Sequence, residues 1–111
     1  MPIESRQIPG GAAVVAISGR LVLGRDVEKL ETLTSELISK GARKFIFDMS
    51  AMDYADSSGI GTLVACLTEI RKAGGELRVA AANARIQRLF NLTGINSMMT
   101  MYPSVAEATG A

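Results

Sequence analysis

Residues 48–67 read DMSAMDYADSSGIGTLVACL, and this stretch decides how the chain is organised. It begins inside a short apolar segment, KFIFDM at 44–49, which is typical of a buried strand. After the two serines, apolar residues recur at helical spacing: Ile60, Leu63, Val64, Leu67 and Ile70. We therefore expect a strand and a helix joined by the loop DYADSSG. Functional residues of such sheets gather where strands end and helices begin.

The same alternation continues on both sides of this stretch. Residues 3–8 and 12–18 predict two strands that form a hairpin around the turn sequence PGG. A helix should begin with Asp26 as its N-cap and end near Ser39. The remaining elements expected are strands at 44–49, 76–82 and 98–102, a helix at 84–94, and a final turn or two after a capping box of Ser104 and Glu107.

This order predicts the α/β class. We expect one α/β domain over residues 1–111, with a mixed, mostly parallel sheet, an N-terminal antiparallel edge hairpin and about four helices. The 12 Lys and Arg residues against 11 Asp and Glu give a net charge of +1, which attracts neither nucleic acid nor an anionic membrane. The longest strictly apolar run, 12–17, is too short to cross a bilayer.

The expected compartment is the cytoplasm. The N-terminal residues MPIESRQIPGG do not resemble a signal peptide, because no basic region precedes a hydrophobic one. Cys66 is the sole cysteine, so an intrachain disulfide is excluded. We interpret it as a packing residue.

Ser57 and Ser58 permit several interpretations. Either serine is suited to cap the helix, with Gly59 and Gly61 allowing close packing. A catalytic serine is disfavoured because the chain has no histidine and no glycine before the serine pair. A phosphate cradle is disfavoured because GxxxxGK[ST] is missing and the three aspartates 48, 53 and 56 would repel the anion. A phospho-aspartate receiver at Asp48 lacks the acidic pair and the lysine that it needs.

The remaining interpretation is a serine that another protein modifies. The start of a helix tolerates a phosphate, whereas a docking partner would be repelled by its charge. The outer face of this helix carries only small side chains for two turns: Ser58, Gly61, Thr62 and Ala65, with Cys66 beside them. Either a partner or a neighbouring helix of the same domain would cover that face.

Three segments carry a resemblance to a known family: VVAISGRL, DMSAMDYADSSGIGTLV and AGGELRVAAANARIQRLFNLTGI. Together they resemble the STAS domain, and specifically the single-domain anti-sigma factor antagonists. The resemblance covers nearly the whole chain in the right order. Its most specific parts are DSSGIG after a strand ending in DMS, and RLFNLTGI after GGELRV.

The resemblance implies a bacterial partner-switching protein that regulates transcription and is not an enzyme. Its unmodified form would bind an anti-sigma factor with a histidine-kinase-like ATPase fold and so release a sigma factor. That kinase would phosphorylate Ser57, and a PP2C-type phosphatase would reverse the reaction. The residues flanking the phosphorylation site would be Asp56, Ser58, Gly59 and Asp48, and the partner-binding residues Gly61, Thr62 and Ala65. No metal or cofactor is expected, since ATP belongs to the kinase, and a weak homodimer is allowed.

The chain departs from the family at one position. The family often reads G-x-L-D after the second strand, whereas this chain reads GRLVLGRD, so that Val22 takes the place of the aspartate and Asp26 lies one helical turn later. Two alternatives therefore stay open. One is another STAS role, as a stressosome component or as the soluble subunit of a lipid transport complex. The other is a small nucleotide- or ligand-binding domain that uses the helix start at residues 57–59.

Overall fold

The computed structural model describes residues 3–110 and places strands and helices in near-regular alternation. The strands are β1 Ile3–Gln7, β2 Ala13–Ile17, β3 Gly19–Leu21, β4 Lys44–Asp48, β5 Met52–Ala55, β6 Glu76–Ala80 and β7 Thr100–Tyr102. The helices are α1 Arg25–Ser39, α2 Ser57–Lys72, α3 Ala84–Thr93 and α4 Val105–Gly110, with a short 3₁₀ turn at Ile95–Ser97.

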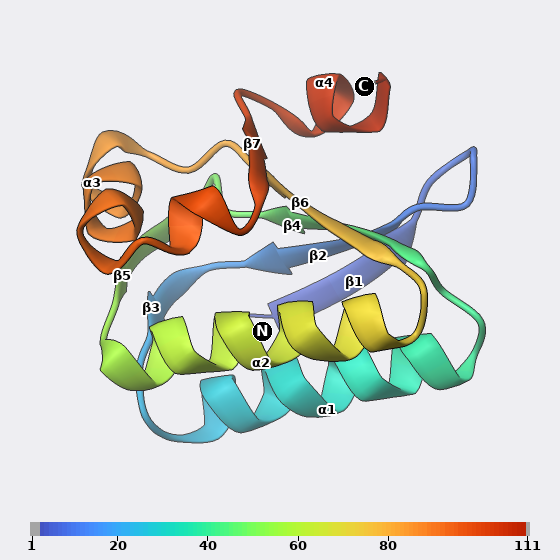
Figure 1. Cartoon of the computed structure of the whole chain (residues 1–111), viewed down its shortest axis with the longest axis horizontal. Coiled ribbons are helices and arrows are strands. Elements are labelled where there is room, and N and C mark those ends of the chain that lie inside the picture. The colour runs from blue at the N-terminus through green and yellow to red at the C-terminus, as the bar shows by residue number, and fades with distance from the viewer. Residues whose placement is uncertain (1–2, 111) are drawn as a thin grey trace.

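Five strands form the main sheet in the order β1-β2-β4-β6-β7 (Figure 1). β1 and β2 pair antiparallel, and the other neighbours pair parallel, as expected for short apolar strands connected by helices. The predicted fold, with its edge hairpin and four helices, is confirmed.

A second, two-stranded sheet pairs β3 with β5 and was not predicted. β3 continues the chain from β2, and β5 continues it from β4, so the main sheet splits at this end. The backbone bends at Gly19, which has a φ of +72° and donates its N–H to the oxygen of Ala51 at 2.8 Å. These strands of three and four residues are too short to show a periodic pattern.

α1 and α2 lie side by side on one face of the sheet, and both begin at the end where β3 and β5 lie (Figure 1). Their apolar sides and the facing strands build the main core, in which three phenylalanines lie among aliphatic and sulfur-containing side chains. Its largest fully buried side chains are Phe45, Phe47, Phe90, Ile3, Ile17, Leu21, Leu30, Met49, Met52, Leu63, Leu67 and Ile70. This layer fixes the position of the start of α2.

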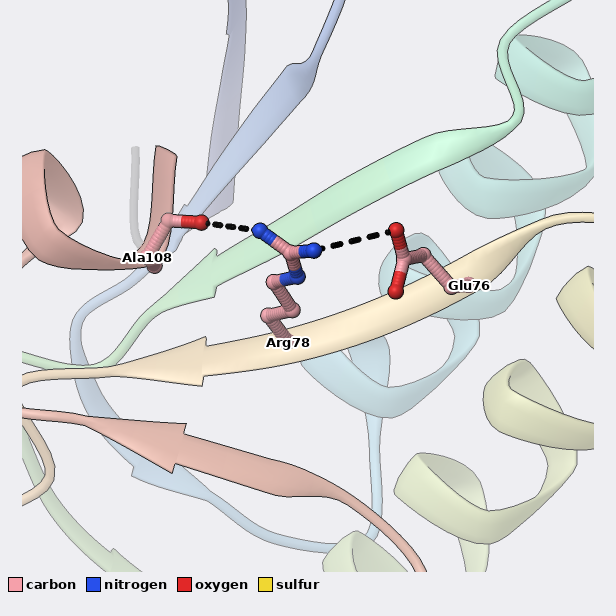
Figure 2. A network of polar contacts seen from close by, with 3 residues as sticks. All are labelled: Glu76, Arg78 and Ala108. Carbon is pink, nitrogen blue, oxygen red and sulfur yellow. Dashed lines mark hydrogen bonds and ion pairs between the residues drawn. The ribbon is translucent and has the colours of Figure 1, made fainter. Parts of the chain in front are cut away.

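α4 covers the opposite face of the sheet. It closes a smaller apolar cluster of Ala12, Val14, Ile46, Ala80 and Ala108. Arg78, on β6, reaches up to the helix and donates a hydrogen bond to the carbonyl oxygen of Ala108 at 2.6 Å, and it pairs with Glu76 at 3.3 Å (Figure 2). Its guanidinium also lies over the ring of Tyr102. A half-buried arginine thus holds the last helix in place.

Two predicted boundaries were wrong. The N-cap of α1 is Gly24, which has no side-chain cap hydrogen bond, and Asp26 lies within the first turn of the helix. The last strand begins at Thr100 because residues 95–97 form a 3₁₀ turn after the left-handed cap at Gly94. The predicted cap of α4 was right, since Ser104 Oγ accepts the N–H of Glu107 at 3.1 Å.

Candidate functional site

The carboxylate of Asp56 caps α2. One oxygen, Oδ1, accepts the backbone N–H of Gly59 at 2.8 Å, and the other, Oδ2, accepts the N–H of Leu23 at 3.1 Å. These two donors, Gly59 first, hold the pKa of the carboxyl below its ordinary value of 3.8. The cap is therefore an anion that joins the start of α2 to the loop between β3 and α1. Neither serine is the cap, contrary to one of the interpretations of the sequence.

Ser57 is the first helical residue of α2 and is exposed, and Ser58 is half-buried. Within residues 3–110 neither serine side chain has a hydrogen-bond partner. The hydroxyl of Ser57 thus lies at the surface, where another protein can reach it. The N–H groups of the first helical turn, which have no partner inside the helix, lie directly beside it.

Gly59 is buried where the first turn of α2 meets the end of β3. A Cβ at this position would lie 2.1 Å from the carbonyl oxygen of Leu21 and 3.2 Å from the Cβ of Ala55. The same carbonyl oxygen accepts the N–H of Asp56 at 3.2 Å. Only glycine allows this approach, so the predicted packing role of Gly59 is confirmed. Gly61 has open space around it and is not needed for packing.

The face of α2 beyond the serines is divided between two environments. Gly61 and Ala65 are exposed and form a smooth strip that continues from Ser57. Thr62 is only 5% exposed and donates to Glu31 on α1 at 3.4 Å, and Cys66 is buried beside it. The expectation that Thr62 belongs to the open face is therefore wrong, because α1 covers this side.

Three further positions that the sequence singled out are Asp48, Val22 and Asp26. Asp48 ends β4 and accepts the N–H of Ser50 at 3.0 Å, and along the chain the whole of β5 lies between it and Ser57. Its carboxylate closes the turn after β4, and its place beside the phosphorylation site stays a prediction. Val22 and Asp26 are both half-buried, before and within the start of α1. Neither has a hydrogen bond to the serine within the described residues.

Leu23 and a cation–π pair are features of this end that the sequence did not single out. The Leu23 side chain is 76% exposed although it is large and apolar. Arg20 on β3 lies over the ring of Tyr54 on β5, 5.2 Å from its centroid, and this tyrosine is also exposed. The sequence GRLVLGR, in which Leu23 directly precedes Gly24, was the one indication that an apolar side chain lies in a loop.

Cys66 and the acidic side chains of residues 3–110 are candidate reactive or metal-binding groups. Burial raises the pKa of the Cys66 thiol to about 11, so the reactive thiolate is scarce. Across residues 3–110, no three His, Cys, Asp or Glu side chains are grouped to hold a metal ion. In the same part of the chain, no helix is both long and apolar enough to span a membrane. What the geometry offers is an accessible hydroxyl, a capped helix start and a smooth adjoining strip.

A model of the STAS domain matches residues 3–108. The chain belongs to the STAS domain family. The predicted family is thereby confirmed, and the α2 start described above is the start of the second helix of a STAS fold.

Several named relatives of this STAS chain are anti-sigma factor antagonists. The anti-sigma-B factor antagonist of Staphylococcus aureus is 30% identical over 73 residues, which are 66% of this chain and 68% of that protein. BtrV of Bordetella bronchiseptica, of the same named class, is 24% identical over 101 residues, which are 91% of this chain and 86% of that one. The match to a Thermotoga neapolitana relative, at 26% identity, spans 66% of this chain and 65% of the relative's length.

Solved structures of the same fold come from two functional settings. SpoIIAA of Bacillus in its phosphorylated form aligns with a TM-score of 0.75 at 21% identity, over 96% of this chain and 95% of that one. A sulfate transporter family protein from Wolinella succinogenes aligns with a TM-score of 0.83 at 18% identity, over 95% and 87%. At these identities the likeness concerns the fold alone.

Proposed function

We propose that this chain is a cytoplasmic anti-sigma factor antagonist whose binding is switched by phosphorylation of Ser57. The observation that carries the proposal is the exposed Ser57 hydroxyl at the first position of α2, beside a strip of small residues. The names of the relatives support the same class. The partner is an anti-sigma factor with a histidine-kinase-like ATPase fold, and a PP2C-type phosphatase restores the free serine.

Phosphorylation follows ordinary phosphoryl-transfer chemistry. The Oγ of Ser57 attacks the γ-phosphorus of ATP, its proton passes to a base of the kinase, and ADP leaves. The product carries about 1.5 to 2 negative charges at neutral pH. The start of α2 stabilises an anion by about 0.3–1 kcal/mol, and the Asp56 carboxylate opposes it by a similar order. The two effects nearly cancel, so the domain stays folded.

The effect on a partner is larger. Gly61 and Ala65 allow another backbone to approach α2 closely, and a phosphate at Ser57 would lie at the edge of that contact. Like charges brought together in an interface cost several kcal/mol, and each 1.4 kcal/mol weakens binding about tenfold. A single modification therefore separates the partners without unfolding either one.

The test is a kinase assay with the serine-kinase anti-sigma factor encoded in the same genome. After incubation with ATP, mass spectrometry of wild type should show one added phosphoryl group at Ser57. Ser57→Ala should show none, and Ser58→Ala, the matched control one residue further on, should still be modified. Modification of Ser58 alone, or of neither serine, would contradict the proposal.

The likeness to a sulfate transporter family protein favours a second candidate, a STAS domain that serves as an accessory or scaffold unit. In that case Ser57 would contact a partner without a phosphorylation cycle. The same assay separates the two, because the accessory unit would bind its partner equally with or without ATP. Saturable binding of free nucleotide by the isolated chain would instead favour a ligand-binding domain.

A further inference from the structure

The loop at residues 22–24 carries an exposed apolar side chain, and few hydrogen bonds hold its backbone. Leu23 is 76% exposed, and Gly24 caps α1 at a φ of +139° without a side-chain hydrogen bond. The first bond of α1, from Glu28 N–H to the oxygen of Gly24, is long at 3.4 Å. Among residues 3–110, the shorter hydrogen bond that holds this loop runs from Leu23 N–H to Asp56 Oδ2 at 3.1 Å. The position of Leu23 therefore depends on a carboxylate from another element, 33 residues away.

That carboxylate serves two donors, and Ser57 follows it directly in the chain. The bond to Gly59 N–H is the shorter of the two, at 2.8 Å against 3.1 Å for Leu23. A phosphate on Ser57 would seek the same N–H groups at the start of α2 and would repel the carboxylate. We expect the phosphate to weaken the longer bond first, which is the one from Leu23 N–H to the Asp56 carboxylate.

We propose that Asp56 is a positioning residue that couples the charge on Ser57 to the position of Leu23. When Ser57 is phosphorylated, the carboxylate turns away and the loop at residues 22–24 is released. The inference rests on the proposed function, since it takes Ser57 as the modified residue. A partner that contacts both Ser57 and Leu23 would then lose an apolar contact as well as meet a phosphate.

Amide hydrogen exchange measured by NMR tests this coupling on the isolated protein. Phosphoserine is incorporated at position 57 during synthesis, so no kinase is needed. The Leu23 amide should exchange about tenfold faster than in the unmodified protein, the loss expected for one charge-assisted hydrogen bond. The amide of Phe47, in the central strand β4, should keep its rate.

Asp56→Asn provides an independent arm. Asparagine caps helices as well as aspartate does, but the two donors face different carboxylate oxygens, and the amide replaces one of these oxygens by an NH2 group that cannot accept. Its one oxygen can keep the bond to Gly59 only by giving up the place opposite Leu23. Faster exchange at Leu23, with Gly59 still protected, is expected. The matched control is Asp48→Asn, which removes the same charge from the turn at Ser50 and should leave Leu23 unchanged.

Unchanged exchange at Leu23 in the phosphoserine protein, or in Asp56→Asn, would overturn the coupling. Equal acceleration at Leu23 and Phe47 would also overturn it, because global destabilisation would then explain the result. These outcomes leave the proposed function standing if the kinase still modifies Ser57. Conversely, faster exchange at Leu23 together with no modification by any kinase would support the coupling and reject the proposed function.

Discussion

Replacing Gly59 by alanine tests the close approach of α2 to β3. The added Cβ would lie 2.1 Å from the oxygen of Leu21, and relief requires a movement of about 1 Å at the start of the helix. Overpacking of this kind costs about 1–3 kcal/mol, and the weakened bond from Asp56 N–H to the same oxygen adds about 1 kcal/mol. The better helix propensity of alanine returns about 1 kcal/mol. The net expectation is a loss of about 2 kcal/mol.

Thermal unfolding followed by circular dichroism measures this loss. For a domain of this size, about 2 kcal/mol lowers the Tm by roughly 8–10 °C. Gly61→Ala is the matched control, two residues further along the same helix, where nothing lies within 4 Å of a new Cβ. It should gain about 0.5–1 kcal/mol and raise the Tm by a few degrees. A Tm for Gly59→Ala equal to or above that of wild type would refute the packing argument.

Three further predictions concern other parts of the chain. Arg78→Ala should lower the free energy of unfolding in urea by about 1–2 kcal/mol, because α4 loses its hydrogen bond at Ala108. Glu76→Gln, which removes only the exposed ion pair, should change it little, and equal losses in the two variants would contradict this. Cys66 should resist a thiol reagent at pH 8 in the folded state and react on unfolding, since burial raises its pKa to about 11; rapid labelling of folded protein would show an open site. Because the pKa of Asp56 is lowered on folding, its stabilisation is complete above pH 3.8 and is lost as the pH falls through the folded-state pKa. Asp56→Asn should therefore be less stable than wild type at pH 7, and the gap should close in acid; a gap independent of pH would argue against the anionic cap.

The sheet and helix order could be predicted because each buried strand is a short apolar run and each helix has a continuous stripe. β3 and β5 escaped prediction, since their three and four residues include exposed positions and show no period. Their pairing depends on the bend at Gly19, which a sequence does not reveal. Strands that form through tertiary contacts, without a periodic pattern of apolar residues, cannot be predicted from the sequence.

The site was predicted in part. The accessible Ser57 and the tightly packed Gly59 follow from their place after a strand and before a helical stripe. Helical spacing alone placed Thr62 outside, because it cannot say which neighbour covers a given side of α2. The bond from Asp56 to Leu23 was missed because it links residues that are 33 positions apart. A side chain's second hydrogen bond depends on the fold and leaves no local signature.

The most direct measurement of the central claim compares two titrations of the kinase anti-sigma factor, one with unmodified protein and one with phosphoserine at position 57. Calorimetry should show binding weakened by about a hundredfold or more in the phosphorylated protein, as expected for a charge placed inside an interface. The Tm of the two proteins should differ by only a few degrees. Equal affinities, or the loss of cooperative unfolding on phosphorylation, would contradict a switch that acts on the partner and spares the fold.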